Sequence, residues 1–227
     1  MVLFQNEACL VINKSAGESS ESSDSNLPDK EGKVFAMPVH RLDMPVTGCL
    51  LLAKTPESAA FLSAAFARRD RKIKKLYWAV IEMPDCALQP EGKLTHWIGF
   101  ERRSNKSVVH AHENAHNKQG KNLQKAVLRY QVIGKGERYL FLEIELITGR
   151  HHQIRAQLAA LSLHIKGDLK YGAKRSEKGG GIRLHAFSLS FPNPLKPDET
   201  IEVKTLPPRM DPLWKAFAEA AGFASPS

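Results

Sequence analysis

The chain has 227 residues, of which 42% are hydrophobic, so it can bury one sizeable core and is expected to form a single domain over residues 1–227. Its 33 Lys and Arg exceed its 24 Asp and Glu, and the formal net charge of +9 favours a polyanionic partner, with nucleic acid first. The three cysteines, Cys9, Cys49 and Cys86, argue against a disulfide framework. Without a signal peptide or a membrane-spanning apolar run, we expect a cytoplasmic protein with no membrane partner.

The first part of the chain alternates apolar runs with polar stretches. A strand is predicted over residues 9–13, whereas residues 15–33 hold too few apolar groups to pack and predict a flexible Ser-rich loop. A second strand is predicted over residues 47–53, and Thr55-Pro56 then begins a helix. This helix ends in basic residues, which suit either the negative helix terminus or an RNA contact: Arg68, Arg69, Arg71 and Lys72.

The second part of the chain reads as strands with two further helices. Alternating large apolar residues predict strands over residues 76–81 and 138–147, separated by a polar surface excursion over residues 104–125. Helical spacing follows Arg150, a strand is predicted over residues 182–191, and a last helix begins at Asp211-Pro212. Strands outnumber helices, so the sequence predicts an α+β fold with a mixed, mainly antiparallel sheet flanked by helices.

A carboxylate stands beside a cation on a loop flanked by proline and glycine. The loop reads His40-Arg41-Leu42-Asp43, then Met44-Pro45-Val46-Thr47-Gly48, and the next strand ends in Ala53-Lys54-Thr55. The neighbouring Arg favours an ionised Asp at a pocket mouth. Taken alone, this pattern fits a structural Asp–Arg pair better than an active site.

Four blocks in sequence change that interpretation. The first resembles the catalytic loop of the RluA-like pseudouridine synthases, whose pattern is His-Arg-Leu-Asp, a short variable stretch, Ser or Thr, and Gly. Three further blocks match the same family in order: Lys75-Leu76-Tyr77-Trp78-Ala79, then Thr148-Gly149-Arg150-His151-His152-Gln153-Ile154-Arg155, then Gly167 to Gly172 with Leu184-His185-Ala186. Ser15 replaces a usual proline, and Met44-Pro45-Val46 is an uncommon filler.

The resemblance implies the pseudouridine synthase fold, a curved sheet with a central catalytic cleft, and an isomerase that turns a uridine of structured rRNA or tRNA into pseudouridine. It implies that Asp43 acts on the target nucleotide, that Tyr77 packs on the uracil ring and that Arg155 pairs with Asp43. The remaining implied residues shape the pocket and meet substrate RNA: His40, Arg41, Arg150, His152, Gln153, Ile154, Leu184 and His185.

The residue types suit this chemistry. Breaking the bond from N1 to C1′ leaves a uracil anion and an electron-poor sugar, so a carboxylate either captures C1′ or removes the C2′ proton. A facing Arg keeps the Asp ionised in a pocket that excludes water, and a flat Tyr ring holds the rotating base. Taken singly, Tyr77 also fits a core position, and Leu184 and His185 fit core packing.

Two alternatives remain at this point. One is a catalytically silent RNA-binding or assembly protein of the same fold, which predicts loss of Asp43, Tyr77 or Arg155, yet all three are present. The other is a metal-dependent RNA hydrolase built on His110, His112 and His116, with Glu113 the nearby carboxylate. We expect no metal, no cofactor and a monomer.

The RNA grip is expected to come from the catalytic domain. Only 42 residues precede Asp43, too few for the upstream S4-type RNA-binding domain of many relatives. Phosphate contacts are therefore expected from residues 68–72, 102–125 and 150–155.

Overall fold

The computed structural model describes residues 1–20, 28–29, 32–33, 36–68, 72–85, 87–112 and 123–223. They form two compact units: the first comprises Met1–Leu76 and His185–Trp214, and the second comprises Tyr77–Leu184 and Lys215–Ser227. Each unit is described by itself below. The single catalytic domain and the central cleft expected from the sequence stay predictions.

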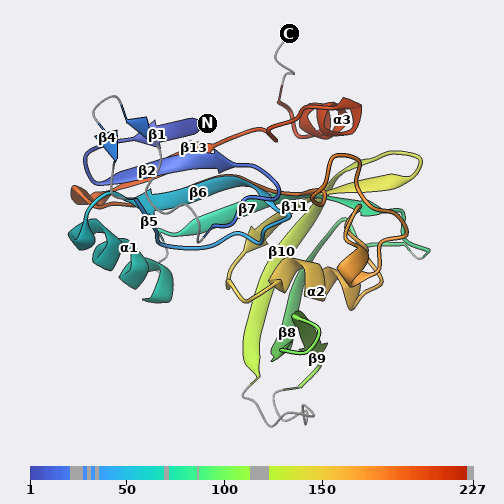
Figure 1. The fold of residues 1–227 in the computed structure, drawn as a ribbon. Coiled ribbons are helices and arrows are strands. Elements are labelled where there is room, and N and C mark those ends of the chain that lie inside the picture. Colours follow the sequence, from blue (N-terminus) through green and yellow to red (C-terminus); the bar gives the residue numbers. More distant parts are fainter. Residues whose placement is uncertain are drawn as a thin grey trace. The chain divides into compact units, whose positions relative to one another are not determined.

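The first unit is built on a sheet in which β2 lies beside β6 (Figure 1). Its strands are β1 (Val2–Gln5), β2 (Cys9–Lys14), β5 (Met37–Pro38), β6 (Thr47–Ala53), β12 (Leu184–Asn193) and β13 (Lys196–Lys204). The order is β1-β2-β6-β12, with β5 also on β6 and β13 on β12. The pair β6–β12 is parallel and the other pairs are antiparallel. A small separate ladder joins β3 (Pro28–Asp29) to β4 (Gly32–Lys33).

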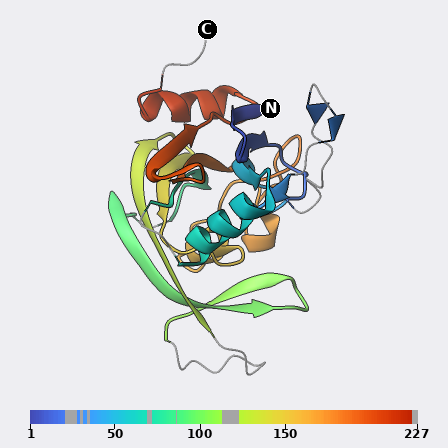
Figure 2. The same ribbon diagram turned by 90° about the vertical axis from the view of Figure 1, so that its left-hand side faces the viewer.

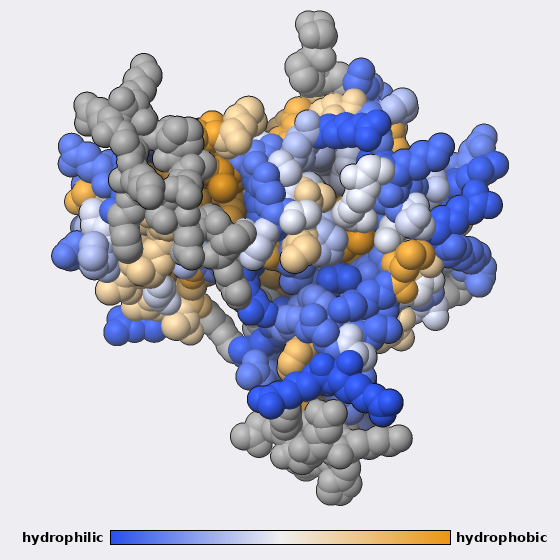
Figure 3. Space-filling model, in the orientation of Figure 1, coloured by the Kyte–Doolittle hydropathy of each residue, from blue (hydrophilic) through white to orange (hydrophobic). Residues whose placement is uncertain are grey.

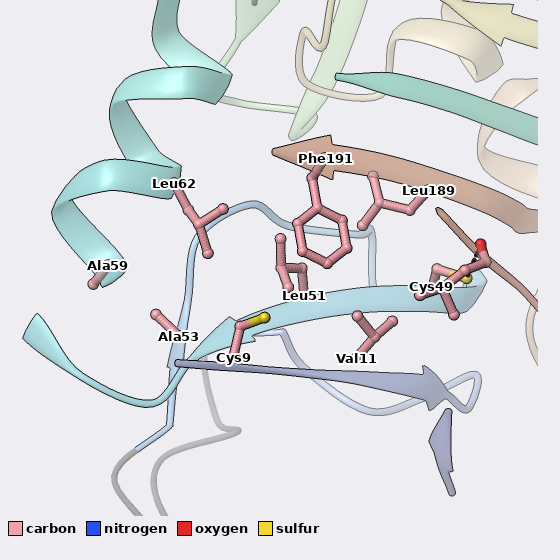
Figure 4. Close-up of a cluster of buried hydrophobic side chains, with 10 residues drawn as sticks. Cys9, Val11, Cys49, Leu51, Ala53, Ala59, Leu62, Leu189 and Phe191 are labelled. Carbon is pink, nitrogen blue, oxygen red and sulfur yellow. Dashed lines mark hydrogen bonds between the residues drawn. The ribbon is translucent and has the colours of Figure 1, made fainter. Parts of the chain in front are cut away.

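The core of the first unit lies between this sheet and helix α1 (Pro56–Arg68). Figure 4 shows Leu62 of α1 facing Phe191 of β12 and Leu51 of β6. All three side chains are buried, at 0% exposure. Thr55 begins the helix as the sequence predicts, because its hydroxyl accepts a hydrogen bond from the Ser58 amide at 3.2 Å. The sheet face and one helix face thus exclude water together.

Gly48 is required by the close approach of β6 to β12. Its φ is +116°, and an added Cβ would lie 2.3 Å from the carbonyl oxygen of Ala186. We expect Gly48→Ala to lower the free energy of unfolding by at least about 2 kcal/mol, because the strain and the clash add. Chemical denaturation followed by circular dichroism measures this loss. Gly17→Ala tests the contribution of strain alone, since its φ is +88° with no atom within 4 Å.

The second unit contains a long sheet of five strands that extends beyond α2 (Figure 2). The strands are β7 (Lys74–Glu82), β8 (Glu91–Glu101), β9 (Lys106–His110), β10 (Gln124–Lys135) and β11 (Tyr139–Leu146), in the order β7-β11-β10-β8-β9. The helical elements are α2 (Gln153–Ala159), η1 (Leu169–Tyr171) and α3 (Pro212–Ala220), which enters this unit at Lys215. Phe217 of α3 packs on Trp78 and Phe141, with ring centroids 4.6 and 5.1 Å apart.

The predicted α+β class with a mixed, mainly antiparallel sheet is confirmed, and β6 has the predicted bounds. The sequence interpretation missed β8, β10 and β13, and it was wrong to treat residues 104–125 as an excursion without structure. This stretch contains β9 and the start of β10, while residues 113–122 lie outside the described part. These strands were missed because exposed polar residues interrupt their apolar alternation, as in β8. No described helix is long and apolar enough to cross a membrane.

Candidate active site

Asp43 lies on the loop that enters β6 in the first unit. Its side chain is half-buried, and its carbonyl accepts a hydrogen bond from the Val46 amide at 2.9 Å, which closes a tight turn through Met44 and Pro45. The turn ends where β6 begins at Thr47. The carboxylate therefore sits on a short constrained turn attached to a buried strand.

The peptide groups on both sides of Asp43 are held by the segment that follows β2. The Ser20 hydroxyl accepts from the Leu42 amide at 3.0 Å and donates to the Leu42 carbonyl at 2.9 Å. The Met44 carbonyl accepts from the Gly17 amide at 2.9 Å and from Lys14 Nζ at 3.2 Å. Residues 15–20 were predicted to belong to a flexible loop, and the structure gives them specific contacts. Flexibility of the loop stays a prediction, and residues 21–27 lie outside the described part.

Lys14 places a buried positive charge beside this turn. Its side chain is 1% exposed, and Nζ also donates to the carbonyls of Ser15 at 2.8 Å and Glu18 at 2.9 Å. Burial lowers the pKa of Lys14 to about 8, against the opposing effect of the charges of Glu18 and Asp43. The sequence analysis did not single out Lys14. A cation at the end of an otherwise apolar strand was the signal available.

His40 anchors the loop to β6. Its Nε2 accepts a hydrogen bond from the Leu51 amide at 3.0 Å, and its ring stacks on Phe66 of α1 with centroids 4.9 Å apart. Burial lowers the pKa of His40 to about 3, helped by the charge of Lys75, so the ring is neutral at pH 7. These contacts give His40 a role in holding the loop that carries Asp43, and its contact with RNA stays a prediction.

His185 is fully buried in the first unit, at 0% exposure. Its Nε2 lies 2.8 Å from the Thr205 carbonyl, which can only accept, so Nε2 carries the proton. Its Nδ1 lies 2.8 Å from the Thr47 hydroxyl and then accepts from it. Burial lowers the pKa of His185 to about 4. Its neighbour Leu184, in the second unit, is 3% exposed. Both side chains pack in the interior, as the core-packing interpretation of this strand proposed.

The lowered pKa of His185 predicts loss of stability in acid. The unfolded chain binds a proton near pH 6.5 and the folded chain only near pH 4, so stability is intact above 6.5 and falls between these values. We expect the contribution lost to be about 3 kcal/mol at most. Urea unfolding of the wild type and His185→Gln at pH 7.5 and 5.0 measures it. The gap between the two proteins should shrink at pH 5.0, and an unchanged gap would exclude a neutral His185 as the cause.

Arg155, in α2 of the second unit, forms a buried bidentate ion pair with Asp168. Its Nε donates to Oδ2 at 2.7 Å and its Nη2 to Oδ1 at 2.8 Å, and the two side chains are 5% and 1% exposed. The guanidinium also lies over the Tyr171 ring, 4.9 Å from its centroid. Asp168 and Tyr171 belong to the matched block 167–172, whose role the sequence analysis left unassigned. The predicted pair of Arg155 with Asp43 joins residues of different units and stays a prediction.

Gln153 and His152 hold the turn before α2. The Gln153 amide oxygen accepts from the Thr148 hydroxyl at 2.7 Å and the Arg150 amide at 3.0 Å, while its nitrogen donates to the Val127 carbonyl at 3.1 Å. His152 is buried in the left-handed conformation with φ +49°, and its Nδ1 lies 3.0 Å from the Tyr171 hydroxyl. These side chains organise the block, and their RNA contacts stay predictions.

The other predicted residues divide between the two units. Arg41 is exposed in the first unit. In the second unit, Tyr77 of β7 is 7% exposed and Ile154 is 4% exposed, whereas Arg150 is half-buried and its Nε donates to the Lys125 carbonyl at 3.2 Å. Within the described residues, no group of three His, Cys, Asp or Glu could hold a metal ion. His116 and Glu113 of the proposed metal cluster lie outside that part of the chain.

Comparison with known proteins agrees with this arrangement. The family described as RNA pseudouridylate synthase matches residues 8–160. An RNA pseudouridine synthase of Zymomonas mobilis is 31% identical, covering 96% of this chain and 95% of that protein. A homologue from Mycoplasma pneumoniae is 30% identical over 85% of this chain, which spans 62% of that longer protein. A tRNA pseudouridine synthase C of Vibrio parahaemolyticus is 26% identical over 95% of this chain and 94% of its own length.

Solved structures show the same fold. Human RNA pseudouridylate synthase domain containing 1 has a TM-score of 0.73 at 22% identity, covering 96% of this chain and 86% of its own. The human domain containing 4 protein has a TM-score of 0.71 at 20% identity, covering 100% and 94%. The chain therefore belongs to the RNA pseudouridylate synthases, the isomerases that convert uridine to pseudouridine in RNA.

Proposed function

We propose that this protein isomerises an unpaired uridine of a structured RNA and that Asp43 is the catalytic carboxylate. The observation that carries the proposal is the half-buried Asp43 on a turn whose flanking peptides are fixed by hydrogen bonds. A carboxylate held in this way can meet C1′ or the C2′ proton of a sugar without first ordering its own loop. Both chemical routes use the same ionised group.

Tyr77 and Arg155 are proposed to complete the chemistry. Tyr77 supplies a flat ring that holds the detached uracil while C5 turns toward C1′. Arg155, already fixed by Asp168 and Tyr171, supplies a cation whose direction is set before substrate binds. A preset cation favours the ionised form of a facing carboxylate.

The substrate is proposed to be tRNA or rRNA, with tRNA tested first, because one relative is named tRNA pseudouridine synthase C. A uridine inside a duplex must leave its stack to reach an enzyme carboxylate, so loop uridines should be preferred. Mapping pseudouridines in cellular RNA with and without this protein tests the proposal. A site that disappears on deletion and returns with the wild-type protein supports it. Unchanged maps with an inactive purified protein would favour the silent RNA-binding alternative.

The hairpin of β8 and β9 is proposed to bind RNA phosphates. Figure 3 shows hydrophilic side chains gathered over β8, β9 and α2. Arg102 and Arg103 are exposed in the hairpin turn, and Lys170 donates to the Asn105 carbonyl in the same turn at 3.1 Å. Phe100, 39% exposed beside them, offers an apolar surface to a base. The basic end of α1 is the second proposed contact, of which residues 69–71 lie outside the described part.

Salt dependence tests this phosphate contact. Each neutralised phosphate releases a counterion, so replacing Arg102 and Arg103 by Gln should weaken RNA binding and flatten the salt slope by about one unit for each phosphate left without its arginine. Filter binding across a salt series measures the slope. Arg129→Gln is the matched control, because Arg129 is exposed on β10 of the same sheet but pairs with Glu145. If the double variant keeps the wild-type slope and affinity, the footprint lies elsewhere.

The metal-dependent hydrolase alternative predicts a different result. It requires activity to disappear after chelation and RNA strands to be cut. Isomerisation by Asp43 requires neither, because the carboxylate and the uracil supply the reacting groups. Incubation of the chelated protein with labelled RNA, analysed for both strand length and pseudouridine, separates the two.

A further inference from the structure

The two residues that flank Asp43 are held by one short stretch of chain, Lys14 and Ser15–Ser20, which we call the template segment. It follows β2 directly and lies within the first unit. Ser20 holds Leu42, on the amino side of Asp43, while Gly17 and Lys14 hold Met44, on the carboxyl side. The catalytic residue is thus fixed from both sides by contacts that avoid its own carboxylate.

The Ser20 hydroxyl completes a two-way hydrogen bond with one residue. It receives the Leu42 amide proton and donates its own proton to the Leu42 carbonyl, at 3.0 and 2.9 Å. Ser20 is 4% exposed, so water does not replace these bonds when the hydroxyl is removed without a change in packing. Loss of the hydroxyl would free a peptide group adjacent to the carboxylate.

Lys14 holds the other side through its full set of three donors. The ammonium group meets three carbonyl oxygens, those of Ser15, Glu18 and Met44, at 2.8, 2.9 and 3.2 Å. A neutral amine has one proton fewer and would leave one of these carbonyls without its donor. The Met44 bond is the longest of the three and joins the template segment to the Asp43 turn.

From these contacts we propose that Lys14 and Ser20 are positioning residues that set the place of the Asp43 carboxylate for catalysis, rather than parts of the core alone. The inference rests on the proposed role of Asp43. A displacement of about 1 Å at a reacting group can cost about 10²-fold in rate, so small movements of Leu42 or Met44 matter. RNA affinity depends on contacts outside this turn and should change little.

Ser20→Ala tests the proposal against a matched control. Ser58 is equally buried at 4% in the same unit, and its hydroxyl donates to the Ala8 carbonyl at 2.7 Å, outside the Asp43 turn. We expect Ser20→Ala to lower the single-turnover rate at saturating RNA by about 10-fold to 10²-fold with KM unchanged. Ser58→Ala should keep the rate at a comparable loss of thermal stability. Ser20→Thr, which keeps the hydroxyl, should recover most of the rate.

Lys14 adds a readout that a purely structural role would not move. The charges facing it are Glu18 on the template segment and Asp43 on the turn, and burial lowers its pKa to about 8. The wild-type rate should fall above pH 8 as the third donor is lost, and Lys14→Arg, which stays charged, should shift this decline upward. Ionisation of the uracil affects both proteins equally, so the difference between the profiles isolates Lys14.

The outcomes separate this inference from the proposed function. If Asp43→Asn is inactive while Ser20→Ala turns over as fast as Ser58→Ala, and the Lys14→Arg profile matches the wild type, positioning by the template segment is wrong and Asp43 keeps its role. If Asp43→Asn remains active, the proposed function itself fails. A slow Ser20→Ala protein with wild-type KM and a shifted Lys14→Arg profile supports the inference.

Discussion

Replacing Asp43 by Asn should abolish pseudouridine formation, with a fall in single-turnover rate of at least about 10³-fold, while RNA affinity stays within a few fold. Asn preserves the size of the side chain and the turn closed by the Val46 amide, but it lacks the charge needed to act on the sugar. Tritium release from RNA labelled at C5 of uridine measures the rate, and filter binding measures the affinity.

The control for this substitution is Asp198→Asn, which makes the same change at an exposed position of β13 in the first unit. It should keep the wild-type rate. Undiminished tritium release from Asp43→Asn would remove this carboxylate from the mechanism. Loss of RNA binding together with activity would instead indicate that Asp43 shapes the RNA surface.

Replacing Asp168 by Ala should lower the free energy of unfolding of the second unit by about 3–5 kcal/mol, the usual cost of removing one partner from a buried ion pair. Arg155 then loses both of its bonds to the carboxylate while its own side chain is 5% exposed. Urea unfolding followed by Trp fluorescence suits the measurement, because Trp78 and Trp97 lie in the strands of this unit.

A double variant distinguishes the ion pair from packing. Arg155→Met with Asp168→Leu removes both charges and should recover much of the stability lost in Asp168→Ala. It should nevertheless remain inactive, because the proposed mechanism needs the cation of Arg155. Glu199→Gln, in the exposed pair with Lys196, should leave stability unchanged. An Asp168→Ala protein as stable as Glu199→Gln would show that the buried pair contributes nothing.

Sequence reasoning was most successful where a local pattern has a single structural solution. The apolar run at 47–53 and the cap at Thr55 predicted β6 and the start of α1 correctly, because burial and capping act over a few residues. Gly48 was noticed as part of a motif, but its physical reason, the approach of Ala186, depends on a strand from the far end of the chain.

The sequence could not reveal the residues that support Asp43. Ser20 stands in a stretch whose composition is typical of disorder, and nothing in that composition shows that one hydroxyl pairs with Leu42. Asp168 was visible within a matched block, yet its pairing with Arg155 requires the chain to return through η1. Such contacts are set by tertiary structure, so periodicity and spacing do not predict them.

The core beneath Asp43 is assembled from two distant stretches of the chain. Cys9, Val11 and Leu51 come from the beginning, whereas Phe191 and Val203 come from the end. During synthesis the ribosome must therefore release nearly the whole polypeptide before this core can close, and the early strands wait with apolar faces exposed. Nascent chains stalled before residue 189 should bind a trigger-type chaperone and be sensitive to protease, whereas chains extended past residue 203 should become resistant.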